Sequence, residues 1–379
     1  MNSSPYRDMI VFGVMGCLFI SYAFFFFVRK QNLLLNGAEK GLICFLVIGL
    51  LYVLLSYFGV FQGFSRLDLY FDNSFIPRQA VYMFILPAVI LFQDDFYTKG
   101  KDYILSHYGT VLFWCLFFAG FLFEDKTIFV STQLILCWLA LKTQSSQWWR
   151  NWARYAVVMI APLPTDGSST VLILRLLFAI IICIPTQWKR ATMKWVAISF
   201  AVVLIVVSFA APLFITDTSV LSDVNAIWRI NYWKDEMLNL MNTYGFGVGY
   251  GTSYPSRSFA ETFGYFNASN RAEMVNNTFV RACHNSFVAV AMRTGILGIT
   301  MLLLFIGLML WEMLRYQTLP SKAAFFALFG AVVCIAFNVG LESPNYLFSF
   351  VFCLGECNQE VYRIRKESRA LMLPVGVAE

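Results

Sequence analysis

Long apolar runs recur along almost the whole chain, and they constrain its fold more than any other feature. Their approximate bounds are residues 9–28, 41–61, 77–93, 108–123, 127–141, 153–164, 167–184, 195–215, 285–311, 323–341 and 344–356. A transmembrane helix needs about 20 apolar residues, and a shorter run can span the bilayer when neighbouring helices shield it. Because a few of these runs are short, we expect about eleven transmembrane helices, within a range of roughly ten to twelve.

The composition supports lipid as the solvent for these runs. Hydrophobic residues make up 59% of the chain and charged residues 13%, whereas an ordinary soluble domain has about 25% charged residues. The first run, 9–28, has no small-x-small cleavage pattern after it, so we expect it to stay as a helix rather than be removed as a signal peptide. The predicted fold class is therefore an all-α, polytopic integral membrane protein.

The distribution of Lys and Arg predicts the orientation of the helices. Basic residues in short loops favour the cytoplasmic side. With a cytoplasmic C-terminus, alternation of the helices puts most of the basic residues inside. The short outer segments then hold only Arg7, Arg66, Arg78 and Lys126. The same alternation predicts an outer N-terminus, and one missed helix would reverse that assignment.

One long loop, residues 216–284, falls on the outer face in this topology. It has mixed charge, glycines and aromatic residues, and long polar loops on a rigid scaffold commonly carry function. The chain thus divides into N-terminal transmembrane helices (1–215), a periplasmic loop with short helices (216–284), and C-terminal transmembrane helices with a basic cytoplasmic tail (285–379).

Within the loop, the sequence predicts a helix over 226–243 followed by a glycine-rich turn. Arg229, Trp233 and Glu236 share one helical face because they are spaced i, i+4 and i+7. The turn carries glycines at alternate positions: Gly245, Gly247, Gly249 and Gly251. It lacks the strand and the lysine of a nucleotide-binding loop. It is therefore interpreted as tightly turned backbone that approaches a ligand, with a plain structural turn as the alternative.

The strongest local pattern is His284-Asn285, followed nine residues later by Gly295-x-x-Gly298. In a continuous helix, His284 and the glycines would share a narrow stripe at the outer membrane boundary, and the small residues would let another helix approach. Arg281 would lie on the same face and Arg293 about two turns deeper. The alternative is a histidine that caps a helix start.

Several arginines are predicted at or near the outer surface. A guanidinium fork matches phosphate oxygens two at a time, and arginines in a membrane usually mark a site or a buried pair. These residues are Arg78, Arg229, Arg281 and Arg293. They predict a lipid phosphate or diphosphate ligand, with snorkelling or pairing to carboxylates as the alternative. Glu342, at the outer end of a helix, either faces this site or caps the next helix.

Other classes of ligand find little support in the sequence. The net charge of +6 is too small for a nucleic-acid footprint. The His, Cys, Asp and Glu residues show no spacing typical of a metal site, so no metal and no cofactor is expected.

These motifs, taken in order, resemble the O-antigen ligases and related polysaccharide polymerases. The resemblance rests on Arg229-x-x-x-Trp233, on the glycine-rich segment from Tyr244 to Gly251, and on His284-Asn285 with Gly295-x-x-Gly298. It is specific over about residues 222–300, and elsewhere it rests on helix count and topology. Such proteins often carry Ser-Arg at a helix start near Thr165 to Ser169, and the arginine is missing here.

The resemblance implies a GT-C-like membrane glycosyltransferase of inverting, metal-independent type. Its donor would be a glycan on undecaprenyl diphosphate, at the periplasmic face of the bacterial inner membrane. By position, Arg229, Arg281 and Arg293 would hold the diphosphate, and His284 would orient or deprotonate the acceptor hydroxyl. The other residues expected to contact substrate are Asn285, Arg78, Trp233, Gly247, Gly249 and Glu342. The implied partners, besides the bilayer and the substrates, are a chain-length regulator and a flippase.

The reaction itself has two variants. A polymerase transfers the glycan to another lipid-linked repeat unit, and a ligase transfers it to a lipid A core. Met292-Arg293-Thr294 before Gly295 favours the polymerase. A transporter and a scaffold of an export complex remain as other classes. A transporter commonly shows inverted repeats and buried acidic residues, whereas this sequence has no detectable repeat and its acidic residues gather in loops.

Overall fold

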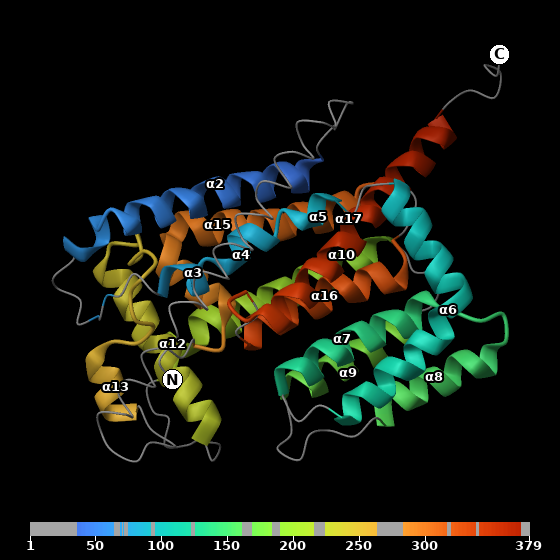
Figure 1. Cartoon of the computed structure of the whole chain (residues 1–379), viewed down its shortest axis with the longest axis horizontal. Coiled ribbons are helices and arrows are strands. Elements are labelled where there is room, and N and C mark those ends of the chain that lie inside the picture. Colours follow the sequence, from blue (N-terminus) through green and yellow to red (C-terminus); the bar gives the residue numbers. More distant parts are fainter. Residues whose placement is uncertain are drawn as a thin grey trace. The chain divides into compact units, whose positions relative to one another are not determined.

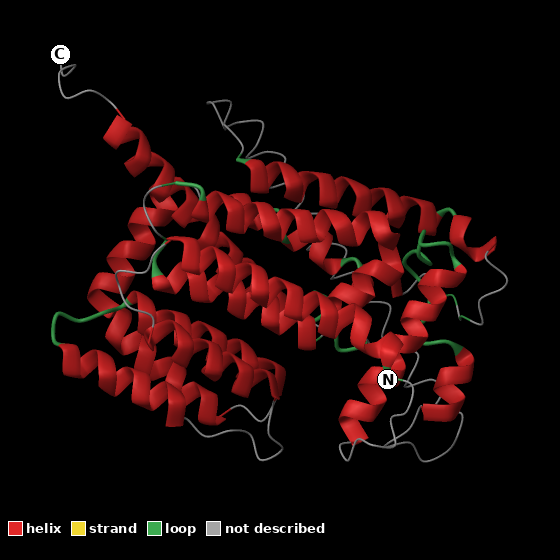
Figure 2. Ribbon diagram, turned by 180° about the vertical axis from the view of Figure 1, so that it is seen from behind, coloured by secondary structure: helices red, strands yellow, loops and turns green. Residues whose placement is uncertain are grey.

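The computed structural model describes residues 36–63, 69, 71, 75–91, 95–122, 126–160, 169–183, 190–215, 224–263, 283–316, 320–338 and 341–372. Within these ranges every regular element is a helix, as Figure 2 shows, and an isolated bridge joins Phe71 to Thr252. The predicted all-helical class is therefore confirmed. The first predicted transmembrane run, 9–28, lies outside the described residues.

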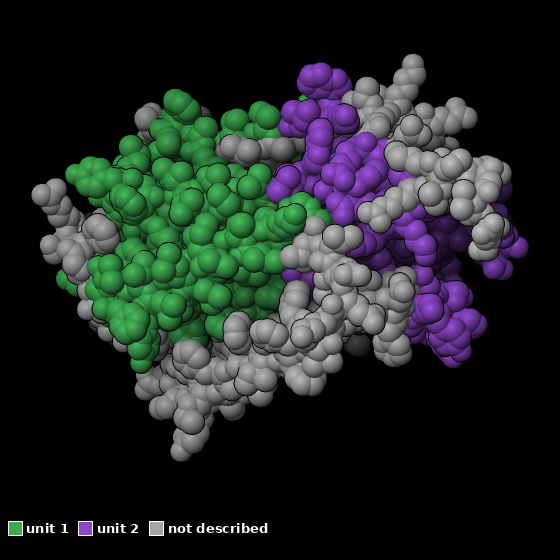
Figure 3. Space-filling view, turned by 90° about the horizontal axis from the view of Figure 1, so that it is seen from above, with its two compact units in different colours: residues 1–87, 199–306, 335–344 green, residues 88–198, 307–334, 345–379 purple. Residues whose placement is uncertain are grey.

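The described residues divide into two compact units, each built from separate stretches of the chain (Figure 3). Unit 1 comprises residues 1–87, 199–306 and 335–344, and unit 2 comprises 88–198, 307–334 and 345–379. The predicted periplasmic loop belongs to unit 1.

Unit 1 is built around α2, the broken segment after it, and the helices of the long loop (Figure 1). Its elements are α2 (Gly37–Tyr57), η1 (Val60–Gly63), α3 (Phe75–Gln79), α4 (Val81–Ile85), the π-helical η2 (Val206–Ala210), α11 (Ala211–Phe214), α12 (Val224–Asn242) and α13 (Arg257–Phe263). It also holds α15 (Ser286–Leu314) as far as residue 306. Helix α2 contacts η1, α3 and α4, and α12 contacts α11 and α13.

Unit 2 is a set of packed helices. Its elements are α5 (Ala88–Leu91), α6 (Asp95–Leu122), α7 (Lys126–Lys142), α8 (Trp148–Ile160), α9 (Ser169–Cys183), most of α16 (Lys322–Phe337), nearly all of α17 (Pro344–Met372), and α10 (Arg190–Ile205) up to residue 198. Helix α7 contacts α6, α8 and α9. An ion pair of 2.6 Å joins Lys101 of α6 to Glu356 of α17, which places α17 beside α6 within this unit.

Two described helices are long and apolar enough to cross a membrane, namely α2 and α15. Four shorter apolar helices cover Val81–Ile90, Phe129–Lys142, Thr170–Cys183 and Lys322–Phe337. Many large apolar side chains on unit 2 are exposed, among them Phe118 at 60% and Leu176 at 61%. Such surfaces fit a lipid environment, because water would penalise them.

The run 77–93, predicted as one helix, is three short helices, and that prediction is wrong. Pro87 lies between α4 and α5, and proline has no N–H and clashes with the carbonyl four residues before it. The chain also turns at Ala80, whose carbonyl accepts from the Met83 N–H at 2.9 Å. Helix α17, predicted to end near residue 356, instead continues to Met372.

Candidate functional site

The segment before α15 is held against α12 by one buried side chain. Trp233 donates its indole N–H to the Cys283 carbonyl at 2.6 Å. The next residue, His284, lies edge-on to Trp228 with 5.9 Å between the ring centroids. Because Trp228 and Trp233 both belong to α12, this helix fixes the position of the histidine. Arg229, one turn before Trp233, is half-buried on the same helix.

Helix α15 begins after the histidine, at Ser286, so the expected stripe of His284 and the two glycines on one continuous helix is wrong. His284 has a φ of +56°, in the left-handed region that non-glycine residues seldom occupy. The side chain of Asn285 caps the helix, because its Oδ1 accepts from the N–H groups of Phe287 at 3.0 Å and Val288 at 3.2 Å. The asparagine, not the histidine, therefore caps this helix start.

The alternating glycines form a compact turn, which we call the glycine loop (residues 245–251). All four glycines have positive φ, between +73° and +85°. A side chain at these positions would be strained, and glycine adopts this conformation freely. The Gly-x-Gly-x-Gly-x-Gly pattern is thus explained by a backbone that alternates in φ.

The glycine loop packs into a break in α15. Gly295 has φ +68° and ψ −171°, so the helical hydrogen bonds stop there. The Val248 N–H donates to the Met292 carbonyl at 2.7 Å and the Gly249 N–H donates to the Arg293 carbonyl at 3.0 Å. In return, the Ile296 N–H donates to the Gly245 carbonyl at 2.8 Å. The loop therefore satisfies backbone groups that the break exposes, which a helix within a membrane protein requires.

The other side of the glycine loop is held by side chains from α2, α3 and α4. Ser56 accepts from the Tyr250 N–H at 2.7 Å, and the Tyr82 and Tyr250 hydroxyls are 2.6 Å apart. Gln79 uses both ends of its amide, accepting from the Gly251 N–H and donating to the Thr252 carbonyl, each at 2.8 Å. The loop is consequently a fixed structural element. Its glycines approach protein backbone and side chains, and substrate binding by Gly247 and Gly249 stays a prediction.

Arg293 is buried beneath this loop, with 1% of its surface exposed. Its guanidinium donates to Thr252 Oγ1, to the Gly249 carbonyl at 3.4 Å and to the Ser253 carbonyl at 3.5 Å, and it lies 4.5 Å from the Tyr254 ring centroid. No carboxylate of a described residue forms an ion pair with it. Arg293 therefore joins α15 to the chain that follows the glycine loop.

Two buried carboxylates, Glu236 and Glu342, lie close enough to influence each other in unit 1. Glu236 is fully buried on the inward face of α12, and Glu342 is 5% exposed. Burial raises the pKa of Glu236 to about 8; nearby Arg293 opposes this rise, and Glu342 and Asp235 add to it. Burial therefore favours the neutral, protonated form of this carboxyl group.

Glu236 should make the stability of the protein depend on pH. The folded pKa of about 8 lies above the ordinary value of 4.5, so the folded state binds more protons between these values and stability should fall as pH rises from about 4.5 to about 8. In Glu236→Gln the fall in melting temperature between pH 5 and pH 9 should be smaller than in the wild type. Glu261→Gln, which changes an exposed carboxylate, serves as the control. An unchanged profile in Glu236→Gln would contradict the assigned pKa.

The structure brings most of the predicted site residues into unit 1, on a few elements. Trp233, His284 and Asn285 lie where α12 meets the start of α15, Arg229 lies one turn away on α12, and Arg293 lies under the glycine loop. Arg281 lies outside the described residues. Arg78 lies in α3, and its side chain is not among those described. Among the described residues, no group of three His, Cys, Asp or Glu side chains could hold a metal ion.

Sequence analysis missed several polar groups of this site. The spacing of residues predicts that Glu236 shares a face of α12 with Arg229 and Trp233, but it does not predict that Glu236 is buried near Arg293. Ser56, Gln79 and Tyr82 lie in apolar runs, and no local pattern links them to a loop that follows 168 to 194 residues later in the chain. A polar residue inside a predicted membrane segment is the one signal that could have marked Ser56 and Gln79.

The fold and the site together define a helical integral membrane protein whose sequence motifs gather around one glycine-rich loop. Residues 155–303 match the family model described as O-antigen ligase. The matched stretch includes α12, the glycine loop and the first part of α15. A search of curated proteins gave no significant match.

Proposed function

We propose that this protein is a polysaccharide polymerase of the O-antigen or capsule type. It transfers a glycan from undecaprenyl diphosphate to a lipid-linked repeat unit at the periplasmic face of the bacterial inner membrane. The observation that carries the proposal is that His284 packs against α12. It lies beside Trp228 and one residue after the carbonyl that accepts from Trp233, within the stretch that matches the family model.

In the proposed reaction His284 orients or deprotonates the acceptor hydroxyl. An imidazole can accept a proton near neutral pH, and it is effective only when its position is fixed. The left-handed backbone at His284 and the cap by Asn285 turn the chain sharply between the preceding segment and α15. The histidine is half-buried, so part of its surface is accessible to an acceptor.

The proposed role of the arginines is to hold the diphosphate and to stabilise it as it leaves. Negative charge grows on the diphosphate in the transition state, and fixed guanidinium groups lower the barrier to its departure. Arg229 is half-buried on α12 and suits direct contact. Arg293 is covered by residues 249–254, so its direct contact with the diphosphate would require this chain to move. In this arrangement Arg293 acts indirectly, by holding residues 249–253 in place.

Replacing each arginine by lysine tests this role. Arg229→Lys and Arg293→Lys should both be strongly impaired in glycan transfer. At position 229 an ammonium cannot replace a bidentate fork on the diphosphate. At position 293 it cannot reach all of the groups of Gly249, Thr252 and Ser253 to which the guanidinium donates. We expect kcat/KM to fall at least about tenfold in each variant, because losing a hydrogen bond to a charged group costs about 1.5–3 kcal/mol. Arg257→Lys, at an exposed position in α13, is the control. Full activity of both variants would assign these arginines a role in structure alone.

The family description favours one further candidate, an O-antigen ligase that transfers the glycan to a lipid A core. Purified protein, a defined undecaprenyl diphosphate oligosaccharide and the two acceptor classes, tested separately, distinguish the two functions. Extension of the lipid-linked repeat unit is expected from the polymerase. Transfer to lipid A core alone would make the protein a ligase. If neither acceptor is used while a small solute crosses liposomes, the protein is a transporter.

A further inference from the structure

A polar pocket of unit 2 is lined by none of the candidate-site residues and has no part in the proposed reaction. Its volume is about 410 Å³, and it is open to the surface. It lies where the first half of α6, the end of α7 and the start of α8 meet. In the topology predicted from sequence, these helix ends face the cytoplasm.

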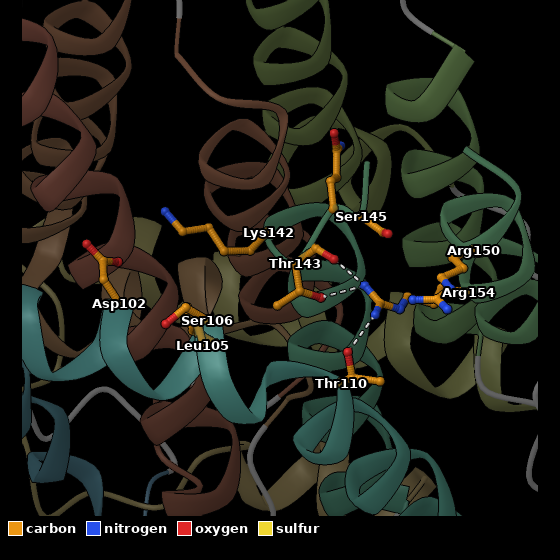
Figure 4. Close-up of a pocket in the computed structure, with 10 residues that line it drawn as sticks. Asp102, Leu105, Ser106, Thr110, Lys142, Thr143, Ser145, Arg150 and Arg154 are labelled. Atoms are coloured by element: carbon orange, nitrogen blue, oxygen red, sulfur yellow. Dashed lines mark hydrogen bonds between the residues drawn. The ribbon is translucent and has the colours of Figure 1, made fainter. Parts of the chain in front are cut away.

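Three cationic side chains line this pocket: Lys142, Arg150 and Arg154. In Figure 4, Arg154 lies between Thr110 and Thr143, with Arg150 beside it and Lys142 across the pocket near Asp102. None of the three cations forms an ion pair with a carboxylate of a described residue. Asp102 is the one acidic side chain in the lining, so the pocket holds an excess of positive charge.

The positive charge is held in place by the protein. Arg154 is buried, and it donates to the Thr143 carbonyl, to Thr143 Oγ1 at 3.2 Å and to Thr110 Oγ1 at 2.7 Å. The turn before α8 is fixed because Asn151 bonds Ser145 in both directions, at 2.7 and 2.8 Å. Asp102, Glu356 and Glu360 are near enough to Lys142 to offset part of its charge. Arg150 and Arg154 are close enough to repel each other, and an anionic ligand reduces that repulsion.

The two helices α6 and α8, which contribute to the pocket, also carry exposed apolar and aromatic side chains. On α8, Trp148, Trp149 and Trp152 are exposed at 72%, 54% and 53%, and the Arg150 guanidinium lies 5.2 Å from the Trp149 ring centroid. On α6, Val111 and Phe118 are exposed beyond the pocket. Tryptophans with basic residues mark the membrane–water interface, and apolar surface next to it suits acyl chains.

We propose that this pocket binds the phosphate group of an anionic phospholipid at the face predicted to be cytoplasmic. Lys142 and Arg150 contact the phosphate oxygens, Arg154 supplies fixed positive charge behind them, and the acyl chains lie along the exposed face of α6. A free phosphate compound offers the same oxygens without the chains. The exposed apolar surface beside the pocket favours the lipid.

The test measures the affinity of the full-length detergent-solubilised protein for phosphatidylglycerol, by native mass spectrometry. Each basic residue near an anionic lipid surface contributes about 1 kcal/mol, which corresponds to about a fivefold change in affinity. Lys142→Gln and Arg150→Gln should each weaken binding about fivefold, and the double variant more than either. Asp102→Asn should strengthen it. Lys366→Gln, an exposed basic residue of α17 outside the pocket, is the matched control and should bind as the wild type does.

The melting temperature without lipid checks that the variants are folded, since both altered side chains are exposed. Lys142→Arg, which keeps the charge, should restore binding. Equal affinity in the wild type and the double variant would overturn the proposal. Displacement of phosphatidylglycerol by millimolar inorganic phosphate or glycerol 3-phosphate would assign the pocket to a soluble phosphate compound, and so would overturn the lipid as its ligand.

Discussion

His284→Ala should abolish glycan transfer while the protein still inserts into the membrane. A positioned acid–base group contributes about 10²–10⁴-fold to a rate, so the product ladder should be lost. The change leaves the hydrogen bond from Trp233 to the Cys283 carbonyl and the Asn285 cap in place, because neither uses the imidazole. Stability should therefore change little. Membrane-fraction abundance, melting temperature and glycan product length measure the three quantities.

The chain offers a close control for this experiment. His107 is the second of its two histidines, and it lies on exposed surface of α6, in unit 2. Its ring contacts Tyr103, Ser106 and Tyr108 of the same helix. His107→Ala should make wild-type product. A wild-type ladder from His284→Ala would remove the histidine from the mechanism, whereas loss of the ladder in both variants would point to a general defect.

Sequence analysis found the fold class and the motif region because both are local patterns. The apolar runs predict helices, and the spacing of Arg229, Trp233 and Glu236 predicts one face of α12, whose inner residues Trp233 and Glu236 are buried. The break at Gly295 could not be predicted in the same way, because Gly295 lies in a run of otherwise helical residues. The break is stabilised only by hydrogen bonds from the glycine loop, which lies about 45 residues earlier in the chain.

Long-range pairing also explains the burial of Arg293. The sequence places an arginine two turns into an apolar helix. Because an unpaired guanidinium is energetically unfavourable there, this position predicts either a protein partner or a substrate. In the structure the guanidinium donates to Gly249, Thr252 and Ser253, two of them through backbone carbonyls. Every residue has a backbone carbonyl, so the sequence does not show which carbonyl will accept from the guanidinium. It shows only the carboxylates, and it suggests a phosphate ligand.

Replacing Gly295 or Gly247 by alanine should disrupt the site strongly. A Cβ at Gly295 would lie 2.4 Å from the Gly245 carbonyl oxygen, and one at Gly247 would lie 2.6 Å from both the Gly295 nitrogen and the Met292 carbonyl oxygen. The atoms in the way are backbone, so no side chain can rotate to relieve the overlap. The φ and ψ of Gly295 also lie in a region that is nearly restricted to glycine, at a strain of about 1–3 kcal/mol.

Both variants should therefore show a lower melting temperature and a loss of transfer, because the glycine loop can no longer hold the backbone of Met292 and Arg293. Gly307→Ala in the same helix is the control: a Cβ there meets nothing within 4 Å. Alanine favours a helix interior over glycine by about 1 kcal/mol, so this variant should be as stable as the wild type or more so. Normal stability and activity in Gly295→Ala would show that the close contact between the glycine loop and α15 does not hold the site together. Lost activity with an unchanged melting temperature would instead show that this contact is needed for the geometry around Arg293 and not for the stability of the fold.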